Sequence, residues 1–275
     1  MGQLDGMVAF VTGAARGQGR SHAIALASEG ADIIAVDACR QIDTVPYPAA
    51  TEEDLAETVR QVEHLGRRIL AEQVDVRDLA GLESVVERGI SLFGRLDIVL
   101  ANAGISAPAP TLTMTEDAWS TMIDVNLTGV WKTVRAAVPH IVAGGRGGSV
   151  VITSSLAALR PNANIAHYSA AKSGLVGFMR VLAKELAPNG IRVNTIHPTT
   201  VATEMVLNDA TYRLFRPDLE APTRDDFVQA ASTLNALPIP LTESSDISAA
   251  VLYLVGNSGR AVTGTTHLVD AGGAL

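Results

Sequence analysis

Short apolar runs alternate with amphipathic stretches along the whole chain. The apolar runs are three to six residues long and rich in Val and Ile, which is typical of buried strands, and the stretches between them repeat apolar residues at helical spacing. The pattern predicts strands over residues 8–11, 33–36, 70–74, 98–101, 150–153, 191–196 and 267–269. It predicts helices over residues 21–28, 55–65, 82–93, 119–138 and 170–186.

Alternation of strands with helices predicts an α/β fold with a parallel sheet covered on both faces. Right-handed crossovers then make the sheet doubly wound, a Rossmann arrangement of about seven strands. A chain of 275 residues suits one such domain over 1–275. Two connections exceed what the fold needs: an insertion near 38–51, expected on the cofactor side, and a substrate lid near 199–240.

The first predicted strand runs directly into a glycine-rich turn, Thr12–Gly19, which follows the spacing Gly-x-x-x-Gly-x-Gly. Glycines allow a tight turn and let backbone N–H groups approach a pyrophosphate, while the start of the next helix favours an anion. The turn therefore predicts a dinucleotide site, with the candidate residues Gly13, Arg16, Gly17, Gln18 and Gly19.

Asp37 ends the second predicted strand, 18 residues after Gly19. A carboxylate there accepts hydrogen bonds from the adenosine ribose and repels a 2′-phosphate, so it favours NAD over NADP. Arg16 and Arg40 argue mildly the other way, because either cation could pair with that phosphate. A helix-capping or loop carboxylate is the alternative interpretation of Asp37.

Tyr168 and Lys172 lie four residues apart in a predicted helix, so both side chains should share one face. Lowering a tyrosine pKa by about three units from ~10 needs roughly 4 kcal/mol. One ammonium about 4 Å away, at an effective dielectric constant of about 20, supplies roughly that much. The pair therefore predicts a general acid–base, although surface Tyr/Lys pairs are also common.

Ser155 follows the fifth predicted strand, 13 residues before Tyr168, and its hydroxyl could bind a substrate oxygen. Ser154 is its neighbour, and alternation along a strand should point the two side chains apart. Both serines could instead simply form a turn.

Composition narrows the class of partner. The formal charge of −8 disfavours nucleic acid and anionic membrane surfaces, so we expect a small-molecule substrate. A single cysteine, Cys39, and no evident signal peptide or long apolar run favour a cytoplasmic protein. The six histidines show no His-x-x-x-His spacing, and we expect no catalytic metal.

Taken together, these motifs resemble the short-chain dehydrogenase/reductase family over nearly the whole chain. The matching features are Thr12–Gly19, Asp75-Val76, Asn102-Ala103-Gly104, Asn126, Ser155, Tyr168-x-x-x-Lys172 and Asn194. The resemblance implies an NAD-dependent enzyme that moves a hydride between the nicotinamide and a hydrophobic secondary alcohol or ketone.

The resemblance also implies catalytic roles. Tyr168 would be the general acid–base, and Lys172 would lower its pKa and bind the nicotinamide ribose. Ser155 would orient the substrate oxygen, and Asn126 would help hold a water that links Lys172 to solvent.

Further residues would bind the cofactor. Asp75 would contact the adenine, with Val76 as its backbone neighbour. Asn102, the first residue of Asn102-Ala103-Gly104, would contact a cofactor ribose or brace the central sheet. The family's usual Pro-Gly after the sixth strand is here His197-Pro198-Thr199, followed by Val201 and by Thr203 in the position that binds the carboxamide. His197 could touch a ligand or be structural.

Three segments, Gly17–Ala23, Cys39–Pro48 and Ile196–Thr199, resemble a narrower group, the carveol dehydrogenase-like, mycofactocin-coupled enzymes. This resemblance implies NAD that exchanges poorly beneath the insertion, mycofactocin as electron acceptor, terpenoid alcohols as substrates and a homotetramer. Alternatively, the insertion only pads the surface, and the apolar residues of the lid face a neighbouring subunit. The apolar residues in question are Met205, Leu207, Tyr212, Leu214, Phe215, Leu219, Phe227 and Leu234.

Two other hypotheses stay open. An NADPH-dependent ketoacyl-type reductase would use the same acid–base set, and Asp37 is the residue that discriminates against it. A non-catalytic dinucleotide sensor would share the fold, but the complete Ser155, Tyr168 and Lys172 set argues against that reading.

Overall fold

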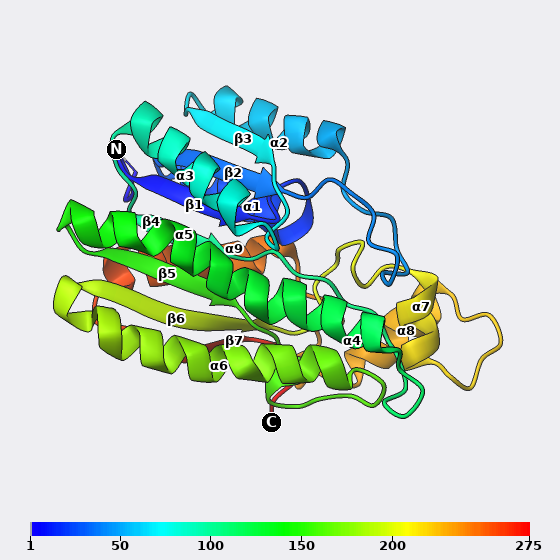
Figure 1. The fold of residues 1–275 in the computed structure, drawn as a ribbon. Helices are drawn as coiled ribbons and strands as arrows, with labels where there is room; N and C mark the ends of the chain where they lie inside the picture. Colours follow the sequence, from blue (N-terminus) through cyan, green and yellow to red (C-terminus); the bar gives the residue numbers. More distant parts are fainter. Residues whose placement is uncertain (1) are drawn as a thin grey trace.

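A computed structural model describes residues 2–275, and its centre is a seven-stranded parallel sheet (Figure 1). The strand order is β3-β2-β1-β4-β5-β6-β7, so the expected doubly wound sheet is confirmed. The strands are β1 Val8–Thr12, β2 Asp32–Asp37, β3 Ile69–Gln73, β4 Ile98–Ala101, β5 Gly148–Thr153, β6 Ile191–Pro198 and β7 Thr266–Val269. The order reverses between β1 and β4, and this is where an open α/β sheet forms its crevice.

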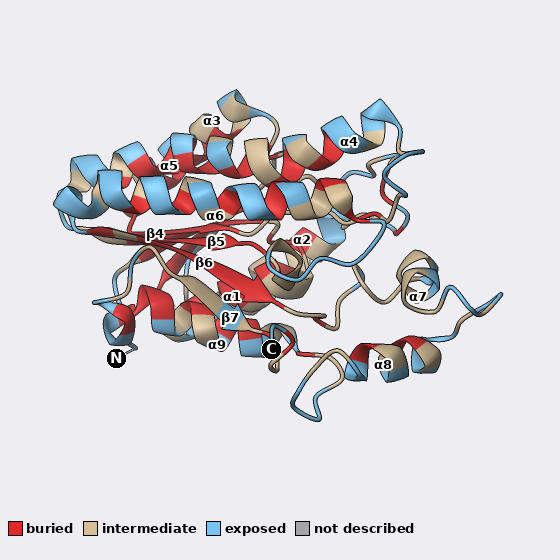
Figure 2. Cartoon of the chain, turned by 90° about the horizontal axis from the view of Figure 1, so that it is seen from below, coloured by how far each residue is buried: buried red, intermediate tan, exposed pale blue. Residues whose placement is uncertain are grey.

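Helices cover both faces of the sheet (Figure 2). Helices α3, α5 and α6 pack on one face, while α1, α2 and α9 pack on the other. The helices are α1 Gly17–Ser28, α2 Glu52–His64, α3 Leu79–Phe93, α4 Glu116–Ile123, α5 Gly129–Gly144, α6 Ala166–Leu186, α7 Asp209–Phe215, α8 Arg224–Ser232 and α9 Ser244–Val255.

Two hydrophobic cores follow from burying both faces of the strands. In β1, Val8 and Phe10 face the α3–α5–α6 core, whereas Ala9 and Val11 face the α1–α9 core. Every residue of β1 is buried, which explains why the run is continuously apolar rather than alternating.

The stretch 119–138, expected to be one helix, is interrupted. Helix α4 ends at Ile123, a π-helical turn covers Asp124–Thr128, and α5 begins at Gly129. The turn places Asn126 so that its Nδ2 donates to the Ile105 carbonyl at 2.9 Å and its Oδ1 accepts from the Ile105 N–H at 3.1 Å. A π-turn of this kind is common at functional sites and leaves no mark on hydrophobic spacing.

The two long connections lie together at the carboxyl edge of the sheet (Figure 1). Residues 38–51, which we call the strap, contain no helix or strand, and residues 199–240, the lid, carry α7 and α8. No helix between residues 2 and 275 combines the length and the hydropathy that a bilayer crossing requires.

Candidate active site

A cavity of about 340 Å³ opens at the carboxyl ends of the strands. Every residue predicted to bind the cofactor or take part in catalysis lines it, and the strap and the lid supply the outer walls. The structure therefore gathers these residues around one space, while their individual roles stay predictions.

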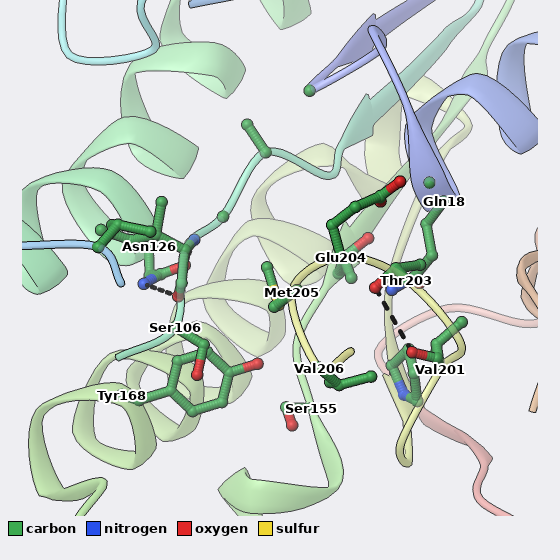
Figure 3. A pocket seen from close by; sticks show the side chains of 18 of the residues that line it. Gln18, Ser106, Asn126, Ser155, Tyr168, Val201, Thr203, Glu204, Met205 and Val206 are labelled. Carbon is green, nitrogen blue, oxygen red and sulfur yellow. Dashed lines mark hydrogen bonds between the residues drawn. The ribbon is translucent and has the colours of Figure 1, made fainter. Parts of the chain in front are cut away.

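The glycine turn between β1 and α1 has no room for side chains. A Cβ on Gly19 would lie 1.9 Å from the Gly13 carbonyl oxygen, and one on Gly13 would lie 2.9 Å from the Ala103 Cα. Beside this bare backbone lies Gln18 (Figure 3), whose buried Oε1 has no hydrogen-bond partner within the described chain. The turn thus leaves its backbone open to a pyrophosphate, which backbone N–H groups bind, while the free Gln18 Oε1 could accept only from a ligand that carries a donor.

Asp37, the last residue of β2, is held at the rim of the cavity. Its Oδ2 accepts from the Ala15 N–H at 3.1 Å, and its Oδ1 accepts from the Cys39 N–H at 3.1 Å. Fixed in this way, the carboxylate faces the space where an adenosine ribose would bind.

The two arginines that argued for a 2′-phosphate have other contacts. Arg16 donates a short hydrogen bond to the Pro48 carbonyl in the strap. The Arg40 guanidinium lies 3.7 Å from the Asp75 carboxylate. Burial works against ionisation of Asp75, but hydrogen bonds from Arg77 outweigh it and hold the pKa of Asp75 below its usual range. These contacts favour a ligand without the extra phosphate.

Asn102 braces the sheet at its switch point. Its Nδ2 donates to the Thr12 carbonyl at 3.0 Å, and its Oδ1 accepts from the Thr153 hydroxyl at 3.3 Å. The amide therefore joins the ends of β1, β4 and β5. The resemblance implies that Asn102 either contacts a cofactor ribose or braces the sheet, and these contacts support the second role.

Tyr168 and Ser155 meet where the start of α6 lies beside the end of β5 (Figure 3). Burial raises the pKa of the Tyr168 phenol, and the nearby Ser155 hydroxyl works against that rise, while the Ser155 Oγ accepts from the Ala157 N–H at 3.1 Å. Ser154 points the other way and donates to the Lys172 carbonyl at 2.8 Å. The two serines diverge as strand alternation predicts.

Lys172 lies on the same wall but does not act as expected on the phenol. Its Nζ donates to the Thr153 carbonyl at 2.8 Å and lies 5.7 Å from the centre of the Tyr168 ring. Burial raises the pKa of Tyr168, and burial also lowers the pKa of Lys172 to about 8. The expected lowering by an ammonium about 4 Å away is therefore not found, because the ammonium is buried over the ring and bonded to a carbonyl.

Gly104 brings the loop after β4 close to this wall. A Cβ at Gly104 would lie 2.7 Å from the Asn126 Oδ1 and 3.3 Å from the Lys172 Nζ. Asn126 makes its polar contacts with the Ile105 backbone and the Met122 sulfur. Its direct effect is thus to position this loop.

His197 is structural. Its ring is fully buried, with Nδ1 at 2.9 Å from the Ser155 carbonyl oxygen and Nε2 at 2.9 Å from the Thr195 hydroxyl. The ring does not line the cavity, so it supports the Ser155 backbone from behind.

The lid closes the cavity with apolar side chains. Phe227 is fully buried, stacks on Tyr212 with ring centres 5.2 Å apart and meets the edge of Phe215 at 4.9 Å. At the start of the lid, Thr203 approaches Gly17, where an added Cβ would lie 3.2 Å from the threonine Cγ2 (Figure 3). Several of the predicted lid residues line the cavity: Met205, Leu214, Phe215 and Leu234.

Sequence reasoning assigned no role at the cavity to Ser106 and none to the individual side chain of Tyr47, and both line it. The Tyr47 phenol oxygen accepts a hydrogen bond from the Ser106 N–H at 3.2 Å, which ties the strap to the loop after β4. No local pattern links positions 59 residues apart, so only the fold reveals this contact. Across residues 2–275, no group of His, Cys, Asp and Glu is arranged to hold a metal.

Comparisons with known proteins agree with this geometry. Residues 7–212 match the family model described as short chain dehydrogenase. The chain is 55% identical, over 100% of both chains, to (−)-trans-carveol dehydrogenase of Rhodococcus erythropolis.

Two solved structures share the fold closely. A carveol dehydrogenase from Mycobacterium avium in complex with NAD superposes with a TM-score of 0.97 at 53% identity, covering 99% of each chain. A short chain dehydrogenase from Mycobacterium paratuberculosis bound to NAD superposes with a TM-score of 0.92 at 42% identity, again over 99% of each chain. From the family match, these relatives and the site, we conclude that the chain belongs to the short-chain dehydrogenase/reductase family.

Proposed function

We propose that the protein is an NAD-dependent oxidoreductase that interconverts a hydrophobic secondary alcohol, of the carveol-like terpenoid class, and its ketone. The observation that carries this proposal is the convergence of Ser155, Tyr168 and Lys172 on one wall of the cavity. The opposite end of the same cavity carries Asp37 and the glycine turn. The carveol dehydrogenases among its relatives support the substrate class.

The residues present fit NAD. The glycine turn would receive the pyrophosphate, Asp37 the adenosine ribose, and Lys172 the nicotinamide ribose. When bound, NAD supplies the nicotinamide that accepts or donates the hydride.

The chain's own residues handle the proton. In the oxidising direction the Ser155 hydroxyl orients the alcohol oxygen, and Tyr168 Oη takes the hydroxyl proton. Burial keeps the phenol pKa high, so the same group readily returns a proton when a ketone is reduced. The lid excludes water from this exchange, since apolar side chains form its inner wall.

We further propose that the NAD is held tightly and is reoxidised by mycofactocin. The strap supports this idea, because Arg16 bonds to Pro48 and Tyr47 bonds to Ser106, on two different sides of the cavity. A dinucleotide beneath a strap fastened at both points would leave slowly. Electrons would then have to leave through a second carrier.

A cytoplasmic homotetramer is the assembly that we propose. Trp131 on α5 and Val181 on α6 are 45% and 56% exposed, and on another side Tyr253 and Leu268 are 40% and 41% exposed. Exposed large apolar side chains of this kind mark subunit contacts. Light scattering on the purified protein tests the tetramer, and a monodisperse monomer would contradict it.

The central experiment is a screen of hydrophobic secondary alcohols with NAD, with NADP, and with an artificial electron acceptor in place of free cofactor. We expect ketone formation, with NAD preferred to NADP, and turnover with the artificial acceptor alone if the NAD is trapped. Asp37→Ala should narrow the preference for NAD. Preference for NADP would favour the ketoacyl-type reductase, and cofactor binding without turnover would favour the sensor.

A further inference from the structure

Tyr47 has an unusual position for a residue of its segment. The strap leaves the sheet at Asp37, beside the adenosine end, yet the Tyr47 phenol reaches Ser106, on the loop that follows β4. That loop shares its wall of the cavity with Tyr168, and Figure 3 shows Ser106 beside the Tyr168 ring. The strap therefore crosses from the cofactor half of the cavity to its substrate half.

The Tyr47 hydroxyl can still donate one hydrogen bond. Its oxygen accepts from the Ser106 N–H, but within the described chain its own O–H finds no acceptor. The side chain is 7% exposed and lines the cavity, so its remaining exposure is to that space. A buried hydroxyl with an unused donor is a strong selector, because a ligand without an acceptor leaves it unpaired.

The Tyr47 phenol stays protonated, as a hydrogen-bond donor must. Burial, with a smaller contribution from the nearby Tyr168, raises the pKa of Tyr47 to about 12. Tyr47 thus keeps its proton over the whole working range, and ionisation of Tyr168 reinforces this state.

Apolar side chains contribute to the substrate side of the cavity. Met205, Leu214 and Phe215 come from the lid, and Leu156 and Pro108 from the loops below it. Polar residues, among them Arg160 and Asn162, line the cavity from exposed positions, whereas the Tyr47 phenol is buried and fixed by the Ser106 N–H, and so gives the site a second polar contact point away from the Ser155–Tyr168 pair.

From this geometry we infer that Tyr47 is a specificity-determining residue, whose phenol donates a hydrogen bond to a second oxygen of the substrate. The preferred substrate is then an apolar secondary alcohol that carries a carbonyl or ether acceptor apart from the reacting carbon. This inference rests on the proposed function for the reaction, but the contact itself can be measured as binding.

The test compares the kinetics of two enzymes, each on the same two substrates. Wild type and Tyr47→Phe are assayed on a cyclic secondary alcohol and on its analogue with an added ring carbonyl. We expect wild type to favour the carbonyl-bearing alcohol by about tenfold in kcat/KM, through KM, and Tyr47→Phe to lose that preference. Ser91→Ala, which removes an exposed hydroxyl on α3, is the control and should behave as wild type.

Calorimetric binding of the two corresponding ketones to the NAD-loaded protein separates this inference from the proposed reaction. If wild type binds the acceptor-bearing ketone more tightly and Tyr47→Phe does not, the inference stands even without turnover. An unchanged preference in Tyr47→Phe overturns it. Loss of bound NAD in Tyr47→Phe with an unchanged substrate preference also overturns it, by assigning the phenol to cofactor retention alone.

Discussion

The strap and the lid both cover the cavity, but different kinds of interaction hold each of them in place. In the strap, the Gln41 Nε2 donates to three carbonyls of its own loop, those of Ile42, Val45 and Tyr47, at 3.1 to 3.3 Å, and its Oε1 accepts from the Ala49 N–H at 2.8 Å. The lid is instead held by aromatic packing around Phe227. Hydrogen bonds fix one geometry, whereas apolar contacts allow sliding, so the strap is suited to retention and the lid to opening in each cycle.

The largest effect on activity should come from a substitution that leaves both the strap and the lid intact. Tyr168→Phe removes the proton carrier, and we expect kcat for alcohol oxidation to fall by about 10²–10⁴-fold. NAD affinity, measured by fluorescence titration, should stay unchanged, since the ring and its packing remain. Turnover close to wild type would remove Tyr168 from the acid–base role.

Phe227→Ala should loosen the lid alone. Removing a fully buried phenyl ring costs about 3–5 kcal/mol of local stability. We expect a large rise in KM for the alcohol and faster proteolysis between α7 and α8, with NAD retention little affected. Phe227→Leu, which keeps most of the apolar volume, should show a smaller version of the same changes. Equal loss of NAD from Phe227→Ala would show that the covers do not act separately.

Gln41→Ala should loosen the strap alone. It removes two donors, shared among three carbonyls, and one acceptor within the loop, and each hydrogen bond lost is worth about 0.5–1.5 kcal/mol. We expect bound NAD to dissociate roughly tenfold faster in a dilution assay, with a smaller change in KM for the alcohol. Gln229→Ala, an exposed change on α8, is the control. If dissociation of NAD is the same in both variants, the strap does not retain the cofactor.

The smallest effect should come from pH. Burial raises the Tyr168 pKa, so the tyrosinate needed for oxidation becomes more populated as pH rises from about 6 to about 9. Ketone reduction, which needs the protonated phenol, should be favoured at the lower end. Initial rates in both directions test this, and oxidation fastest below pH 7 would contradict it.

Sequence patterns predicted the sheet because its inner strands are buried on both sides and therefore read as apolar runs, as Val8–Thr12 does. They also brought Ser155 and Tyr168 to one site, since the carboxyl ends of parallel strands and the following helix starts share an edge. The alternation that separates Ser154 from Ser155 worked for the same reason.

The predictions that were wrong or incomplete concerned contacts between residues that lie far apart in the sequence. The distance and orientation of Lys172 relative to the phenol were assumed from helix spacing, but the lysine is drawn toward the Thr153 carbonyl. The π-turn at Asn126 and the reach of Tyr47 to Ser106 are set by what packs on the other side. Between the two roles of Asn102, only the positions of Thr12 and Thr153 could decide.

The buried ring of His197 makes the catalytic strand end sensitive to acid. Burial, together with the nearby positive Lys172, holds the His197 pKa below its usual range, so the folded protein binds its proton less readily than the unfolded chain does. Stability should therefore decline as pH falls below about 6.5, the value of an unperturbed histidine. The Nδ1–H donates to the Ser155 carbonyl in either state, whereas protonation of Nε2 would place a new donor, and a buried positive charge, where the ring now meets the Thr195 hydroxyl. Mild acid should thus disturb the contact with Thr195 first and spare the bond that supports Ser155.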